Sequence, residues 1–221
     1  MLKQQYTEFI PYLNNFEKRG YRAADIDQRF PQHAMIVYAN EPDHDDFTTK
    51  FFDSAPAKAR AEAINFGGRV ILRQLETLSD KERAIKRLED LWKSRIDSNA
   101  DPEELMEFGW WFKNSPMQRK DTLDQMIKTL TATRGKIDVP YEIIEELVGY
   151  ATEHPVESIT ILDQIARSES ESHEVSYKKE EYRQIIRLVK EAKNTEATKI
   201  ADALINHLGS RGFIDDFRDL L

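Results

Sequence analysis

The sequence predicts an all-α protein of about ten helices, arranged as an α-α superhelix of stacked helical hairpins. The first observation is an internal repeat, because residues 108–128 recur 39 positions later as residues 147–167. The second is a looser third copy from Arg183 to Gly209, with offsets of 41 and 42. The third is that the apolar residues of each copy follow the 3.6-residue period of a helix. Repeats of about 40 residues with two helices each are typical of helical solenoids.

The first two copies match over both predicted helices. An identical tripeptide and an aligned proline in one register are not expected by chance. In the third copy, Leu188 aligns with Leu147, and we expect Phe108, Leu147 and Leu188 to occupy one buried position. The matched pairs are Phe108 and Leu147, Phe112 and Ala151, Pro116 and Pro155, and Leu123-Asp124-Gln125 with Leu162-Asp163-Gln164.

Residues 1–100 are predicted to form an N-terminal helical region, in which residues 43–76 have the spacing of a degenerate repeat. Residues 34–39 are apolar enough for a strand, but they have no partner strand and are expected to be packed coil or helix. Ser79, with Glu82 three residues later, predicts a capping box. The helices of this region are expected at residues 3–19, 43–53, 57–76 and 80–97.

Residues 101–221 are predicted to form three helical-hairpin repeats and a closing helix, and in each repeat we call the first helix A and the second B. The polar residues 168–176 are expected to form an exposed loop. The first repeat opens at Asp101-Pro102 and has its B helix at residues 117–133, the second opens at Pro140 with its B helix at Pro155, the third spans residues 177–208, and the closing helix begins at Phe213.

Composition limits the classes of function. The 221 residues carry a net charge of −8 and include no cysteine, which excludes disulfides and thiolate metal sites. No apolar run approaches the ~20 residues of a membrane span, and the N-terminus does not resemble a signal peptide. We therefore expect a cytoplasmic protein that does not enter a membrane. Residues 101–174 carry sixteen acidic and seven basic side chains, which favours basic partners and makes nucleic acid a poor one.

Catalytic signatures are absent from the sequence. It contains no P-loop, no glycine-rich dinucleotide turn, no zinc-protease motif and no nucleophile elbow, and its histidines do not cluster. The run from Asp43 to Asp46 could hold a cation, but acidic residues in a first helical turn also complement the helix dipole, which is the simpler interpretation. We expect no enzyme activity, no cofactor and no metal.

Trp110 has two interpretations. At about 100° per residue it points away from the stripe of Leu105, Phe108 and Phe112. Either another helix covers it, most simply residues 80–97, or it is an exposed anchor for a partner. Its neighbour Trp111 is expected in the core.

Residues 101–210 resemble HEAT-like and armadillo-like helical repeats, since their units match one another. More loosely, residues 91–95, the Phe-Gly-Trp-Trp-Phe segment and residues 217–221 look like the C-terminal helical regions of large bacterial proteins associated with phage defence. Those proteins carry an NTPase or nuclease-like head. This resemblance implies a scaffold or sensor arm whose chemistry lies elsewhere in a larger polypeptide.

The HEAT-like resemblance also implies a binding surface, because B helices line the concave side of such stacks. There a ladder of amide side chains often hydrogen-bonds the backbone of an extended peptide. Gln125, Gln164 and Asn206 are the matching positions, with Lys128 and Arg167 beside them. Asp121, Asp163 and Asp202 nearby would favour a basic or neutral peptide. A merely solvated helix face remains the alternative.

The sequence also aligns charges on the A helices, where Glu142 and Glu146 correspond to Arg183 and Arg187. We expect these residues to face one another across a repeat boundary. Two functions remain in competition. The first is a non-enzymatic protein-interaction module. The second is a HEAT-like nucleic-acid-binding protein or DNA glycosylase, which would need a basic groove and a catalytic carboxylate beside aromatic residues. One helical turn after Trp110, however, the residue is Lys113 rather than an acid.

Overall fold

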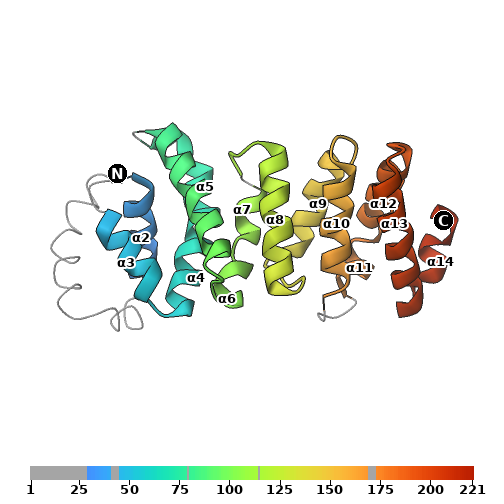
Figure 1. Ribbon diagram of the computed structural model, residues 1–221, viewed down its shortest axis with the longest axis horizontal. Helices are drawn as coiled ribbons and strands as arrows, with labels where there is room; N and C mark the ends of the chain where they lie inside the picture. The colour runs from blue at the N-terminus through green and yellow to red at the C-terminus, as the bar shows by residue number, and fades with distance from the viewer. Residues whose placement is uncertain (1–28, 41–44, 79, 114, 169–172) are drawn as a thin grey trace. The chain divides into compact units, whose positions relative to one another are not determined.

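The structure is a computed structural model that describes residues 29–40, 45–78, 80–113, 115–168 and 173–221 (Figure 1). Within these ranges every regular element is a helix, as predicted, and there is no strand. None of the helices in these ranges is long and apolar enough to cross a membrane. The chain divides into two compact units, Met1–Glu107 and Phe108–Leu221. The helix predicted at residues 3–19 lies outside the described residues.

In the first unit, α2 packs against α3, α4 and α5, and α4 packs against α6. The run at residues 34–39 is helical rather than extended, and it buries Ala34, Met35 and Val37. Tyr38 on the same helix donates a hydrogen bond to the carbonyl oxygen of Arg87 at 2.9 Å. The helices are α2 (Arg29–Asn40), α3 (Asp45–Ser54), α4 (Ala57–Phe66), η3 (Gly67–Ile71), η4 (Leu72–Thr77), α5 (Lys81–Asp97) and α6 (Pro102–Met106).

The helix predicted at residues 57–76 is present, but its hydrogen-bonding pattern changes twice. α4 continues into a π turn, η3, and then into a 3-10 segment, η4, where Gln74 has a φ of −115°. The change begins at Gly67, and glycine pairs are common where a helix changes its ladder. The start of α5 also differs from the prediction, because Asp80 caps the helix by accepting the N–H of Arg83 at 3.1 Å. Ser79 lies outside the described residues.

The first predicted A helix is not continuous. It consists of α6 in the first unit and α7 (Gly109–Lys113) in the second, separated by a turn at Glu107 and Phe108. The division between the units therefore falls after Glu107, whereas the sequence places it after residue 100. A close approach fixes α7, because a Cβ on Gly109 would lie 2.0 Å from the carbonyl oxygen of Asp138.

In the second unit, the helices form two rows. α8 packs against α10 and α10 against α13, while α7 packs against α9 and α9 against α12. The B helices form the first row, which Figure 1 shows from the front, and the A helices form the second. The remaining bounds are α8 (Arg119–Thr133), α9 (Pro140–Tyr150), α10 (Pro155–Ala166), α11 (His173–Tyr177), α12 (Lys179–Glu191), α13 (Thr195–Leu208), η5 (Gly209–Phe213), α14 (Ile214–Phe217) and η6 (Arg218–Leu220).

The buried positions confirm the first repeat match and correct the second. Phe108 and Leu147 are fully buried, as expected, but Leu188 is only half-buried. Val189 is buried in its place. The A helix of the third copy therefore follows the second at an offset of 42, the same offset that relates the B helices.

The turn after α8 is set by a second close approach. Gly135 has a φ of +79°, and a Cβ there would lie 2.2 Å from the carbonyl oxygen of Gln164. Glycine is required here for two reasons. The left-handed backbone disfavours a side chain, and the carbonyl oxygen of Gln164 occupies the space that a Cβ would need. This contact places the end of α8 directly against the backbone of α10.

The loop predicted at residues 168–176 is smaller than expected. Ser168 is buried, and residues 173–177 form the short helix α11, in which Val175 is buried. The prediction of an exposed loop was wrong here because Val175, which lies among polar residues in the sequence, packs into the core. Residues 169–172 lie outside the described residues.

We predict that Leu147→Ala and Leu188→Ala differ in cost, although the sequence alignment treats them as equivalent. Leu147→Ala leaves a cavity in the core and should lower the free energy of unfolding by ~2–5 kcal/mol. Leu188→Ala should cost clearly less, since this side chain is half-exposed. Urea denaturation of both variants measures the difference, and equal losses would contradict the offset of 42.

Gly135→Ala should be destabilising by at least ~1–2 kcal/mol from the left-handed backbone alone, with the contact to Gln164 adding to it. Gly149→Ala is the matched control, because Gly149 lies within α9 and a Cβ there meets nothing within 4 Å. That change should stabilise by up to ~1 kcal/mol. Thermal melts that rank the two variants in the opposite order would exclude this packing.

Candidate functional site

The predicted partner-binding residues other than Trp110 lie on the row of B helices. We call the outward side chains of Gln125 and Lys128 on α8, of Gln164 near the end of α10, of Arg167 just after it, and of Asn206 on α13 the amide face. Lys128, Arg167 and Asn206 are exposed, whereas Gln125 and Gln164 are half-buried. Because α8, α10 and α13 pack in sequence, the structure brings the three amides onto neighbouring helices.

The amide of Gln164 is partly used within the stack. Its Nε2 donates a hydrogen bond to Thr131 Oγ1 on α8 at 2.9 Å. Its Oε1 is buried and has no donor among the described residues, and the same holds for Oε1 of Gln125. Gln164 thus links α10 to α8, and two amide oxygens on the face are left without hydrogen bonds. An amide has the capacity for more bonds than these.

Arg167 links the next pair of helices. Its Nε donates to both carboxylate oxygens of Asp163 at 2.8 Å, and its Nη2 approaches the carbonyl oxygen of Ala203 on α13 at 3.5 Å. The guanidinium group therefore neutralises Asp163 and bridges α10 to α13.

Other acids of the row are also paired. Lys120 Nζ lies 2.9 Å from Glu157 Oε1 and 3.4 Å from Asp124 Oδ2. The hydrogen bond that Lys120 donates to Glu157 raises the pKa of Lys120. Asp202 pairs with Lys190 of α12 at 2.6 Å. The sequence predicts a preference for basic peptides from Asp121, Asp163 and Asp202, but two of these three carboxylates are already paired.

Trp110 lies on α7, in the row of A helices rather than on the amide face. It is half-buried, so the structure matches neither of the two extremes predicted for it. Trp111 is 1% exposed and packs edge-to-face on Phe108, with ring centroids 4.9 Å apart. Trp111 therefore belongs to the core, as expected.

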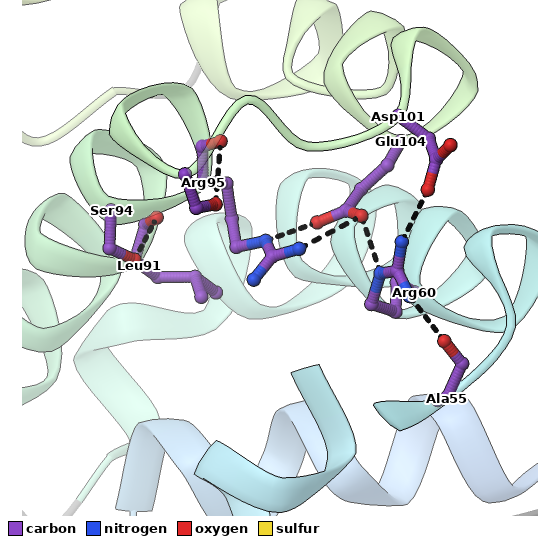
Figure 2. Close-up of polar contacts among 8 residues, drawn as sticks. Ala55, Arg60, Leu91, Ser94, Arg95, Asp101 and Glu104 are labelled. Atoms are coloured by element: carbon purple, nitrogen blue, oxygen red, sulfur yellow. Dashed lines mark hydrogen bonds and ion pairs between the residues drawn. The ribbon is translucent and has the colours of Figure 1, made fainter. Parts of the chain in front are cut away.

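A buried charged cluster in the first unit was missed by the sequence interpretation (Figure 2). Glu104, on α6, is fully buried between Arg60 of α4 and Arg95 of α5, and its carboxylate accepts hydrogen bonds from both guanidinium groups. Arg60 also donates to Asp101 Oδ2 at 2.6 Å and to the carbonyl oxygen of Ala55. Two cations and two carboxylates thus join three helices.

The two positive and two negative charges of this cluster pair with one another, so no ligand is needed to balance them. The sequence analysis assigns no role to Glu104. Its distance of four residues from Phe108 was the available signal, because residues four apart share one face of a helix. Charges buried in this way are retained only when they are paired and hydrogen-bonded.

Replacing Glu104 by Gln should lower the free energy of unfolding by ~3–5 kcal/mol, because both arginines then stay buried beside a neutral group. Asp101→Asn is the control, since the Asp101 side chain is 57% exposed and such a pair contributes ~1 kcal/mol or less. Denaturant unfolding distinguishes them. A Glu104→Gln protein as stable as the Asp101→Asn protein would refute the proposed role of the cluster.

The described residues include no group of His, Asp and Glu side chains that could hold a metal ion. Asp43 and His44, from the predicted alternative cation site, lie outside the described residues. One open hollow of about 520 Å³ is lined by Lys193, Thr195, Thr198, Lys199 and Asp202, beside the start of α13.

Comparisons of the chain with protein-family models, with curated proteins and with solved structures find no match. The resemblances to HEAT-like repeats and to the helical regions of defence proteins therefore remain predictions.

Proposed function

We propose that the chain is a non-enzymatic protein-interaction module that holds an extended protein segment across the amide face. The segment belongs to a partner protein or to a larger polypeptide of which the chain is a scaffold or sensor arm. The observation that carries this proposal is the placement of Gln125, Gln164 and Asn206 at corresponding positions of three successive helices.

The spacing of the helices supports an extended ligand. Packed helix axes lie ~8–10 Å apart, so the three amides span about 20 Å. An extended chain rises ~3.3–3.6 Å per residue, and about six residues therefore cross the face. Each amide offers a donor and an acceptor, which suits recognition of a backbone rather than of particular side chains.

The amides are not equally available. Asn206 is exposed, and Gln125 makes no side-chain hydrogen bond among the described residues. Gln164 already donates to Thr131, so it orients the face and offers its remaining Oε1. Two backbone N–H groups of the ligand, each reaching one of the two buried oxygens after a small rotation of the amide, would satisfy acceptors that are otherwise left unpaired at a cost.

The charges that remain unpaired decide the character of the ligand. Asp163 and Asp202 are paired with Arg167 and Lys190, whereas Lys128 is exposed and has no carboxylate partner among the described residues. Asp121 on α8 is exposed as well and has no cationic partner among the described residues. The two remaining charges offset one another, which favours a neutral segment.

Replacing Gln125 and Asn206 together by Ala should weaken binding of an extended peptide by tenfold or more. The measurement is fluorescence anisotropy with 12-residue peptides selected against the full chain from a displayed library. Gln184→Ala is the matched control, because this exposed amide lies on α12 in the other row. Asn206→Ala and Gln184→Ala remove exposed side chains and should each change stability by about 0.5 kcal/mol or less. Gln125 is half-buried, so the melting temperature of the double variant is measured beside its affinity. Equal affinity of the double variant and the control would contradict the proposal.

Duplex DNA should bind weakly at physiological salt, because the net charge of −8 repels phosphates. Anisotropy with a labelled duplex at increasing salt concentration measures this. Submicromolar binding that falls steeply with salt would favour the nucleic-acid alternative instead.

A further inference from the structure

One face of α12 holds the closing segment of the second unit, residues 214–220, through a line of cations. Arg183 donates to both carboxylate oxygens of Asp219 at 2.9 and 2.6 Å, and to the carbonyl oxygen of Asp216. Lys179 Nζ lies 3.0 Å from Asp216 Oδ1. Lys190 donates to the carbonyl oxygen of Leu220. Cations spread over the length of α12 thus contact one acidic segment.

These contacts replace the pairing predicted from the sequence. Arg183 was expected to face Glu142 of α9, but its carboxylate partner is Asp219. The hydrogen bond that Asp219 accepts from Arg183 lowers the pKa of the Asp219 carboxyl group. The prediction failed because the repeat alignment contains no information about the closing segment.

The repeat register explains why this face of α12 contacts another segment of the chain. At the offset of 42, Arg183 corresponds to Tyr141 of α9. Tyr141 packs edge-to-face on Tyr177, with ring centroids 6.1 Å apart, and Glu145 of the same helix pairs with Lys178. Both contacts hold the chain just before α12. The face that α9 uses for the next repeat is therefore the face that α12 uses for residues 214–220.

The closing segment is held by one buried side chain and by polar contacts on either side of it. Phe217 is fully buried, whereas Ile214, Asp215, Arg218 and Asp219 are exposed. Exposed ion pairs contribute little to stability. The segment joins α13 through η5, in which Gly212 has a φ of +96° and open space around it. The contacts to Asp219 are exposed, and those to Asp216 and Leu220 are partly buried. A segment with one fully buried side chain and such polar contacts opens at lower free energy than a core helix does.

We propose that the face of α12 formed by Lys179, Arg183 and Lys190 is a binding surface for an acidic, aromatic-anchored segment of a partner protein, and that residues 214–220 occupy it as an internal competitor. The pattern that fits is the one already bound, an aromatic residue flanked by acids as in Asp216-Phe217-Arg218-Asp219. The three cations lie on α12 in the row of A helices, and α14, which carries Phe217, packs against α13. The residues of this surface differ from those of the amide face.

A full-length variant with Phe217→Ala and Asp219→Asn disables the internal segment and allows the test. The probe is a fluorescent peptide of residues 209–221 with the native sequence. An internal segment competes at an effective concentration of order millimolar, so the disabled variant should bind the peptide at least tenfold more tightly than the unmodified chain. Adding Arg183→Ala to the disabled variant should reduce that binding tenfold or more. A peptide that carries Asp216→Lys and Asp219→Lys should bind the disabled variant at least tenfold more weakly than the native peptide does.

Equal binding by the disabled variant and the unmodified chain would overturn the proposal, as would binding that is indifferent to Arg183. A disabled variant that fails to fold would overturn it too, because residues 214–220 would then be an integral part of the core. Hydrogen exchange of the unmodified chain gives an independent result. Amides of residues 214–220 should exchange faster than those of α13, and Asp219→Asn should accelerate them alone. Exchange at the rate of α13 contradicts an internal competitor.

Discussion

The second unit depends on the backbone contact between Gly135 and Gln164. Because the end of α8 meets the carbonyl oxygen of α10 without a side chain between them, the two B helices are fixed in distance and register. The same contact sets the Gln164 side chain beside Thr131, where it donates its hydrogen bond. Burial of the apolar stripe supplies the energy of packing, but that stripe alone would tolerate sliding. The glycine contact does not, so it decides which outward residues become neighbours.

This register gives the two rows of helices different roles. On the B helices, polar side chains connect one helix to the next, as Gln164 and Arg167 do, and leave amide capacity facing outward. In the row of A helices, each helix contacts the next member of the row. α9 packs against α12, and α12 contacts residues 214–220. The second unit thus carries one proposed binding surface along its B helices and another on α12.

Much of the second unit could be predicted because its boundaries are encoded locally. Pro140 and Pro155 open helices where the sequence places them, and the B helix predicted at residues 117–133 ends at Thr133. Long-range contacts were not accessible in this way. The burial of Glu104 depends on two arginines from other helices, and the partner of Arg183 lies 36 residues away. An alignment of repeats compares corresponding positions in different repeats. It therefore cannot show which segment packs against the last repeat.

The central claim is that corresponding positions on successive B helices act together on one extended ligand. Side-chain NH₂ resonances of glutamine and asparagine report this directly in a ¹⁵N-correlated NMR titration of the full chain with a selected peptide. We expect the resonances of Gln125, Gln164 and Asn206 to shift together with one apparent affinity, while that of Gln184 on α12 does not move. Shifts confined to α12 and the closing segment, with the three B-helix amides unchanged, would contradict it.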